Sequence, residues 1–297
     1  MIRLAVRVGR DQADLVLAEL LELAPAGVEE VAAGADAVEF AVYGAPGELP
    51  RLPDLQAVAG DALVEISTSE IADDWHERWR EFHRPVSIEA PSGEQAPGRP
   101  VVPALRIRPP WEPEMAKARG AAAVCEIVID PGQAFGTGGH ASTRLCLQLL
   151  LELAARGSAA GALLDVGTGS GVLAIAAAKL GFDPLLALDN EAESVAAARA
   201  NACVNGVLLD ARRLDLRREA LPWLSDEQQS PVVVLANLLR PLLLELAGAI
   251  VRAPAHLIAG GLLVAQVDEV VAAFEARGLR ERERRSEGVW AAAWLSA

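Results

Sequence analysis

The chain has 297 residues, of which 52% are hydrophobic and 23% are charged. This much apolar material is enough for a sizeable core and excludes extensive intrinsic disorder. The 41 acidic and 27 basic residues give a net charge of −14, which excludes a generic nucleic-acid-binding surface because such a surface needs a positive field. An acidic surface instead keeps a protein in solution or attracts a basic partner.

The cysteines and the apolar segments exclude two further classes of protein. No CxxC pair occurs among Cys125, Cys146 and Cys203, so neither a disulfide framework nor a metal site is indicated. Each thiol is expected to pack as a small buried hydrophobe. The longest stretch without a charged residue covers 253–267, which is too short for a membrane span. We therefore expect a soluble, cytoplasmic protein without membrane contact.

Residues 1–70 have the pattern of a small α+β domain. Their apolar spacing predicts strands over 2–8, 27–31, 37–43 and 63–67 and helices over 11–23 and 55–59. The resulting βαββαβ order is typical of a ferredoxin-like fold. This segment holds 13 acidic and 4 basic residues, a net charge of −9. The charge is either a solvated acidic surface or a docking face for a cationic protein.

The next segment links this domain to a larger one. Residues 72–84 are predicted as a short helix that carries Trp75 and Trp79 on one face, packs against a neighbouring domain and ends before Pro85. A Pro- and Gly-rich insertion follows over 91–103. Strand and helix patterns then alternate, as in an open parallel α/β sheet. The expected division is an acidic domain over 1–70, a linker helix and insertion over 71–104, and an α/β domain over 105–297.

The most informative segment is an apolar strand that ends in a glycine-rich turn and runs directly into a helix. The turn has the spacing G-x-G-x-G at Gly167, Gly169 and Gly171. A dinucleotide fingerprint, G-x-G-x-x-G, needs a glycine where Val172 stands, so the spacing favours an S-adenosylmethionine site. A purely structural turn is the alternative.

An acidic residue on the following strand strengthens this interpretation. The strand predicted over 185–188 ends at Asp189, 22 positions after Gly167. A carboxylate at that place accepts hydrogen bonds from both hydroxyls of a ribose. Asp165, two residues ahead of the first glycine, belongs to the same pattern. The glycine turn alone is a weak signal, but together these features predict a nucleoside-containing donor.

A polar residue also follows the strand predicted over 232–236. In this type of sheet, ligands bind beyond the carboxyl ends of the strands, which places Asn237 where a methyl donor meets its acceptor. Many amine and base methyltransferases have an Asn-Pro-Pro-aromatic motif here, whose ring stacks on a flat acceptor. Leu238 and Leu239 lack that ring, so the sequence favours a flexible aliphatic amine as acceptor.

A glycine-dense loop over 130–140 precedes a helix predicted over 143–153. Such a loop can close over a bound donor, and Thr143 can reach the donor from the start of the helix. A lone histidine such as His140 is more often a structural hydrogen-bonding residue than a catalytic base, and we assign it no catalytic role.

These segments resemble one family, the ribosomal protein L-eleven methyltransferases (PrmA family). The resemblance rests on DPGQAFGTGGHAST over 130–143, LLDVGTGSGVLAIAAAKLG over 163–181 and ANLL over 236–239. The paired tryptophans, LRIRPPWEP and the ending GVWAAAWL support it, and it covers about residues 72–297. The first of these motifs is highly specific, whereas the glycine motif is shared by many methyltransferases.

The resemblance implies a small substrate-recognition domain joined to a seven-stranded, Rossmann-like class I methyltransferase domain. It implies an enzyme that methylates the N-terminal α-amine and lysines of ribosomal protein L-eleven, a basic protein substrate; we expect this enzyme to be a monomer. Asn237 is then the catalytic residue. The implied S-adenosylmethionine contacts are Thr143, Gly167, Asp189 and Asn237, and we add Gly169 and Phe135. The departures from the family pattern are Ser142, Thr168, Asn190 and the insertion, and they leave these contacts in place.

Three other functions remain open from the sequence. The first is lysine methylation of a different protein, because related enzymes share the catalytic loops and dock other substrates. The second is methylation of a small molecule, which the separate acidic domain disfavours. The third is binding of the donor without turnover, which the presence of Asp189, Asn237 and the complete loop disfavours.

Overall fold

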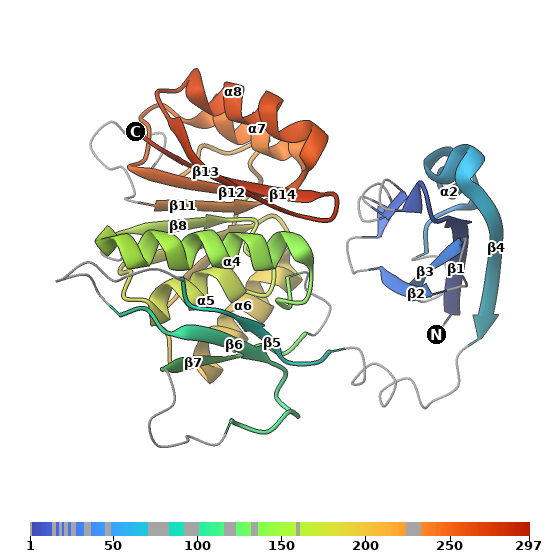
Figure 1. The fold of residues 1–297 in the computed structure, drawn as a ribbon, viewed down its shortest axis with the longest axis horizontal. Coiled ribbons are helices and arrows are strands. Elements are labelled where there is room, and N and C mark those ends of the chain that lie inside the picture. Colours follow the sequence, from blue (N-terminus) through green and yellow to red (C-terminus); the bar gives the residue numbers. More distant parts are fainter. Residues whose placement is uncertain are drawn as a thin grey trace. The chain divides into compact units, whose positions relative to one another are not determined.

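The structure is a computed structural model of the chain. It describes residues 2–13, 16–17, 20, 23–24, 28–32, 37–44, 49–70, 83–91, 101–115, 123–131, 136–158, 161–223 and 233–297. The chain divides into two compact units, Met1–Phe82 and His83–Ala297, each of which is built around its own sheet (Figure 1).

The smaller unit is a four-stranded antiparallel sheet with helices in its connections. Its strands are β1 (Ile2–Gly9), β2 (Glu29–Ala32), β3 (Ala37–Gly44) and β4 (Leu63–Glu70), in the order β2-β3-β1-β4. Helix α2 (Leu52–Ala59), with a short 3-10 turn η1 (Gly60–Ala62), precedes β4. Between β1 and β2, the described residues Ala13, Val16, Leu17, Leu20 and Leu23 are helical. The predicted βαββαβ, ferredoxin-like arrangement is confirmed.

The larger unit is built on a seven-stranded sheet, as predicted. The strands are β8 (Leu163–Val166), β9 (Leu185–Asp189), β10 (Asp210–Arg213), β11 (Val233–Asn237), β12 (His256–Leu263), β13 (Arg280–Glu287) and β14 (Trp290–Ser296). Their order is β10-β9-β8-β11-β12-β14-β13, parallel except for β14, which is antiparallel to both neighbours. The chain therefore reverses its strand order between β8 and β11, and ligands bind at such a switch point.

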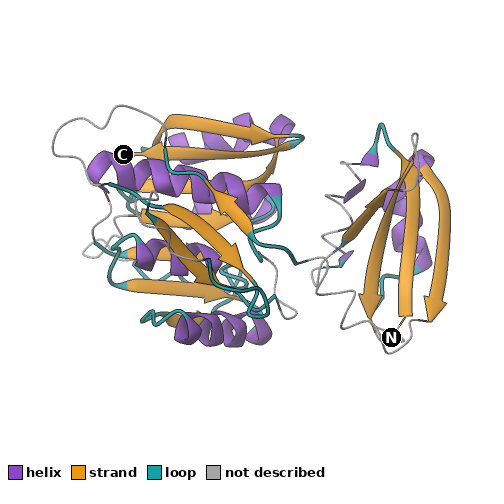
Figure 2. Ribbon diagram, turned by 60° about the horizontal axis from the view of Figure 1, so that its bottom comes forward, coloured by secondary structure: helices purple, strands orange, loops and turns teal. Residues whose placement is uncertain are grey.

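Helices cover both faces of this sheet (Figure 2). Helices α4 (Ala141–Leu153), α5 (Val172–Lys179) and α6 (Ala192–Val204) lie on one face, and α7 (Arg240–Ala249) and α8 (Val267–Glu275) lie on the other. A π-helical turn, η2 (Ala154–Ser158), extends α4, and a 3-10 turn, η3 (Val264–Gln266), precedes α8.

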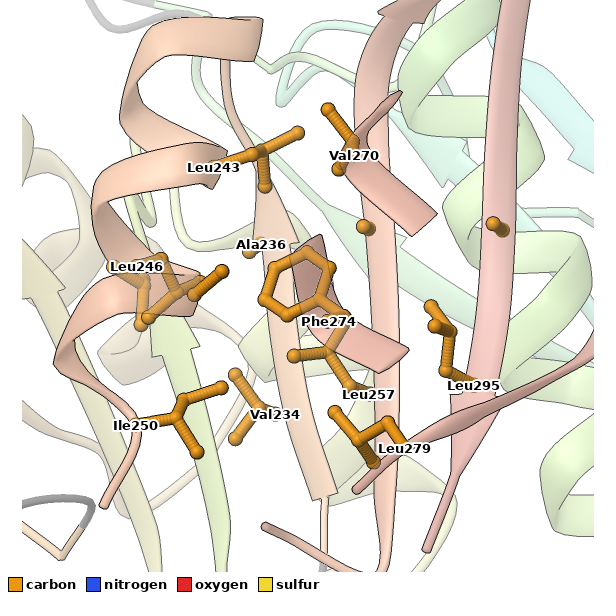
Figure 3. Close-up of a cluster of buried hydrophobic side chains, with 14 of the residues drawn as sticks. Val234, Ala236, Leu243, Leu246, Ile250, Leu257, Val270, Phe274, Leu279 and Leu295 are labelled. Carbon is orange, nitrogen blue, oxygen red and sulfur yellow. The ribbon is translucent and has the colours of Figure 1, made fainter. Parts of the chain in front are cut away.

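The core lies between the sheet and α7 and α8 (Figure 3). There Val234 and Ala236 of β11 pack with Leu243, Leu246 and Phe274 of the two helices, and all five are fully buried. Alternate residues of a strand point to opposite faces. Leu164 and Val166 of β8 belong to this cluster, so Asp165 between them points to the face covered by α4, α5 and α6.

A three-stranded sheet that the sequence did not predict precedes α4. Strand β5 (Val86–Ile88) pairs antiparallel with β6 (Ala104–Arg108), which pairs parallel with β7 (Val124–Val128). Strand β5 falls within the segment expected as a linker.

The structure describes the expected linker helix and insertion only in part. Residues 71–82, with Trp75 and Trp79, and residues 92–100 of the insertion lie outside the described residues. His83 and Arg84, expected at the end of the helix, are not helical, because a residue before proline is disfavoured in the α conformation.

The cysteines only partly match their expected burial. Cys146 is buried, but Cys125 is half-buried and Cys203 is exposed. Cys203 follows the buried Ala202 on α6 and therefore lies on the solvent face of that helix. In the part of the chain that the structure describes, no helix is long and apolar enough to cross a membrane.

Candidate active site

The glycine turn joins β8 to α5 in a conformation that needs its glycines. Gly167, Gly169 and Gly171 have φ angles of 74°, 52° and 85°, a region that residues with a Cβ rarely adopt. A Cβ on Gly171 would stand 3.1 Å from the Cα of Ala198, so this glycine also lets α6 approach the turn. The N–H groups of Gly167 and Thr168 donate to the Leu188 carbonyl, at 2.8 and 3.0 Å, and fix the turn against β9.

Asp189 stands at the carboxyl end of β9 beside this turn. Its Oδ2 accepts from the N–H of Gly169 at 2.9 Å, and its Oδ1 accepts from the N–H of Glu191 at 3.0 Å. Burial raises the pKa of Asp189, and the backbone hydrogen bonds oppose that rise. The two N–H groups fix the carboxylate in one orientation, and its oxygens keep lone pairs for further donors.

Asp165 is fully buried beneath the same turn. The hydroxyl of Thr168 donates to its Oδ2 at 2.7 Å. Burial raises the pKa of Asp165 to about 7, and the negative charge of Asp189 also raises it. Both charged and neutral forms of this carboxyl are therefore populated near neutral pH.

Asn237 and Thr143 meet on the other side of the turn. Asn237 ends β11, and Thr143, which is fully buried, lies in the first turn of α4. The Asn237 Nδ2 donates to the Thr143 Oγ1 at 3.3 Å. A hydroxyl can donate or accept, so this contact persists if the amide is turned by 180°. The buried Asn237 Oδ1 has no hydrogen-bond partner among the described residues.

The loop that precedes α4 is attached to the glycine turn. The Ser170 hydroxyl donates to the Gly136 carbonyl at 2.6 Å. Gly138 packs against β6, where an added Cβ would stand 3.1 Å from Ile107 Cγ2. Phe135, which we expected to contact the donor, lies outside the described residues.

His140 has the structural role that the sequence favoured. It is the N-cap of α4, and its Nδ1 accepts from the Ser142 N–H at 3.3 Å and lies 2.8 Å from the Ser142 hydroxyl. Its ring packs edge-on against Trp290, with centroids 4.6 Å apart. Burial lowers the pKa of His140 to about 4, and the charge of Arg144 also lowers it, against the opposing charge of Glu287. The ring is therefore neutral at pH 7.

We expect the His140→Asn variant to lose less stability in acid than the wild type, because asparagine caps a helix without titrating. The unfolded chain takes up a proton at His140 below about pH 6.5, and the folded chain does so only near pH 4. His140 therefore costs the wild type about 3 kcal/mol of unfolding free energy as the pH falls through this range.

Urea unfolding of both proteins between pH 7 and pH 4.5 measures this effect. The comparison uses the difference between the two proteins because the raised pKa of Asp165 gives the opposite slope over the same range in both. A difference in stability that does not change with pH would contradict the expected role of His140.

The structure thus brings the predicted residues into two neighbouring groups. Gly169 and Asp189 are hydrogen-bonded to each other, as are Thr143 and Asn237. Leu238 connects the groups, since a Cβ on Gly167 would stand 2.2 Å from its Cδ2. Sequence reasoning missed Ser170, the buried Asn201 of α6 and the buried Asn205 that caps the carboxyl end of this helix. The available signal was the spacing of the two asparagines by one helical turn.

Comparison with known proteins identifies the family of this chain. The family model for ribosomal protein L11 methyltransferase (PrmA) matches residues 53–296. The chain belongs to the PrmA family. A ribosomal protein L11 methyltransferase of Heliobacterium modesticaldum is 37% identical over 225 residues, which are 74% of this chain and 63% of the relative. That of Pelotomaculum thermopropionicum is 36% identical over 250 residues, which are 82% of this chain and 73% of the relative.

A solved structure from the same family is also similar. The ribosomal protein L11 methylase of Lactobacillus delbrueckii subsp. bulgaricus has 28% sequence identity and a TM-score of 0.53, over 65% of this chain and 94% of that one. The chain spans less than two thirds of the length of some PrmA relatives, 63% for Heliobacterium modesticaldum and 64% for Geobacter metallireducens.

Proposed function

We propose that the chain is an S-adenosylmethionine-dependent methyltransferase that modifies amino groups of ribosomal protein L11. The observation that carries the proposal is the pairing of Asn237 with Thr143 at the carboxyl end of β11, beside the glycine turn and Asp189. Membership of the PrmA family and the similarity to ribosomal protein L11 methyltransferases support this choice of substrate. A cytoplasmic location, expected from the sequence, is part of the same proposal.

The residues present fit this donor. The Asp189 carboxylate is held by two N–H groups at the end of β9, where a ribose is bound in sheets of this kind. Gly167 and Gly169 let the backbone approach the ligand closely, and Thr143 and Asn237 offer a hydroxyl and an amide. The unpartnered Oδ1 of Asn237 is an acceptor that a ligand N–H can satisfy.

When bound, the donor supplies a methyl group that is already activated on a positively charged sulfur. The protein then has to hold an amine in line with that methyl group. Good positioning lowers the activation free energy by roughly 7–11 kcal/mol. The amine must be neutral to attack. Only about one lysine in 2,500 is neutral at pH 7 at its ordinary pKa of about 10.4. An α-amine has a pKa of about 7.7–8.0, so a much larger fraction of it is neutral.

Asn237 suits this task because its amide is neutral. The amide oxygen orients an amine N–H and adds no negative charge. A carboxylate in its place would stabilise the protonated ammonium form and raise the pKa of the amine. Leu238 and Leu239, which follow Asn237, present no aromatic ring for a flat acceptor.

The N-terminal unit is the proposed recognition domain for the protein substrate. Its first 70 residues have a net charge of −9. Among the described residues, Arg3 pairs with Glu39 and Arg51 with Asp54. The net negative charge attracts a basic protein and favours its docking. The proposal assigns residues 1–70 to recognition, 71–104 to the link and 105–297 to catalysis.

Donor binding tests the first half of the proposal. We expect Asp189→Asn to weaken binding of S-adenosylmethionine and S-adenosylhomocysteine by about 10- to 100-fold, the loss of a hydrogen bond to a charged group. Isothermal titration calorimetry measures this. Asp183→Asn is the matched control, since Asp183 is exposed and precedes the opposite end of β9. Equal affinity in the wild type and the Asp189 variant would remove Asp189 from the donor site.

Mass spectrometry tests the second half. Ribosomal protein L11 is incubated with the enzyme and donor, and fragmentation then assigns each added methyl group. Methyl groups on the α-amine and on lysines are the expected result. Methylation of other proteins of a cell extract, with none on L11, would support methyl transfer to proteins but contradict L11 as the substrate.

A further inference from the structure

Two buried asparagines, Asn201 of α6 and Asn205, the residue that follows the last turn of that helix, hold the end of strand β7. Asn205 accepts the N–H of Val128 at its Oδ1, at 2.9 Å, and donates to the Val128 carbonyl at 2.7 Å. One helical turn earlier, Asn201 accepts the N–H of Asp130 at 2.9 Å. The two side chains therefore take the place of a neighbouring strand along 128–130. Asn201 is 2% exposed and Asn205 is 8% exposed, so these bonds are shielded from water.

Asn201 differs from Asn205 in one respect. Its Nδ2 donates to the carbonyl of Ser170 in the glycine turn, at 2.9 Å. In the described part of the chain, the Asn205 side chain bonds only to the backbone of Val128 and of Asn201. Asn201 is thus the member of the pair that connects β7 to the glycine turn.

Ser170 completes the connection. Its hydroxyl donates to the carbonyl of Gly136 at 2.6 Å. Asp130 and Gly136, which flank residues 131–135, are therefore both attached to the glycine turn, the first through Asn201 and the second through Ser170. The close approach of Gly171 to Ala198 holds α6 against the same turn, so Asn201 projects from a fixed position.

We propose that Asn201 is a positioning residue for donor binding. It sets the spacing between the glycine turn and Asp130, where the loop before α4 begins, without touching the donor itself. This inference rests on the proposed function, because the ligand that needs this spacing is S-adenosylmethionine.

Calorimetry with S-adenosylhomocysteine, alongside thermal unfolding, tests the proposal on the full chain. Asn201→Ala and Asn205→Ala each remove buried hydrogen bonds, so both should lower Tm. Asn201→Ala should also weaken ligand binding about tenfold, because Asp130 and the glycine turn are then no longer held together, whereas Asn205→Ala should leave the Kd unchanged.

Two further variants keep the test decisive if Asn201→Ala fails to fold. Asn201→Asp retains an oxygen for the Asp130 N–H and loses the donor to Ser170, and Ser170→Ala removes only the bond to Gly136. Each should weaken ligand binding, and the double variant should lose less than the product of the two single losses, because both act on the same spacing.

The outcomes separate this inference from the proposed function. A wild-type protein that binds neither S-adenosylmethionine nor S-adenosylhomocysteine contradicts the proposed function. A wild-type protein that binds, with wild-type Kd in the Asn201 variants, overturns the positioning role. An equal loss of affinity in Asn205→Ala also overturns it, since the pair would then be merely structural.

Discussion

Replacement of Asn237 by aspartate is expected to slow methyl transfer at saturating donor on the order of 100-fold at pH 7. A carboxylate within about 4–6 Å raises the pKa of an amine by about 1–3 units, which lowers the neutral fraction that can attack. Donor binding should change much less, because the added negative charge attracts a positive sulfonium. Turnover with L11, measured together with donor Kd, separates the two effects.

The pH profile distinguishes this cause from simple damage. The Asn237→Asp enzyme should recover activity as the pH rises, since alkali deprotonates the acceptor. Asn237→Ala removes the orienting amide without adding charge, so its loss should not be recovered at high pH. Equal turnover of wild type and Asn237→Asp at saturating donor would contradict the proposed role of Asn237.

Gly261→Ala is expected to have the largest effect on stability. Gly261 has a φ of 76°, and a Cβ there would stand 2.5 Å from the carbonyl oxygen of Leu238. Strain in the left-handed region and the forced shift of the backbone together should cost roughly 2–5 kcal/mol. Leu238 follows Asn237, so the shift should also lower turnover.

Gly278→Ala is the matched control for Gly261→Ala. Its φ is 90°, but an added Cβ would meet nothing within 4 Å. The Gly278→Ala variant has the backbone strain but no steric clash. It should lose roughly 1–3 kcal/mol of unfolding free energy with no effect on turnover. Urea unfolding and a methylation assay of both variants measure this; equal losses of stability would show that the contact with Leu238 does not matter.

The strands that carry the site were predictable because their signals are local. Strands β8, β9 and β11 are short apolar runs that end in a glycine or a polar residue, and their predicted ends differ from the structure by about one residue. The carboxyl ends of parallel strands meet at one edge of a sheet, so the sequence alone could place Asp189 and Asn237 at the same edge.

The features that were not predicted depend on contacts far apart in the sequence. Asn201 bonds to Asp130, 71 residues away, and no local pattern announces such a bond. The start of α4 was placed at Thr143, but the helix begins at Ala141 with His140 as its cap. Histidine can accept at an N-cap only when its ring is neutral, and burial, which the sequence does not show, keeps it neutral here.

The most direct test of the account is the intact mass of unmodified ribosomal protein L11 after incubation with S-adenosylmethionine and this enzyme. We expect mass gains in steps of one methylene with the wild type, and much slower gains with the Asn237→Asp variant at the same donor saturation. No gain in mass with a wild-type enzyme that binds the donor would contradict the proposed methylation of L11.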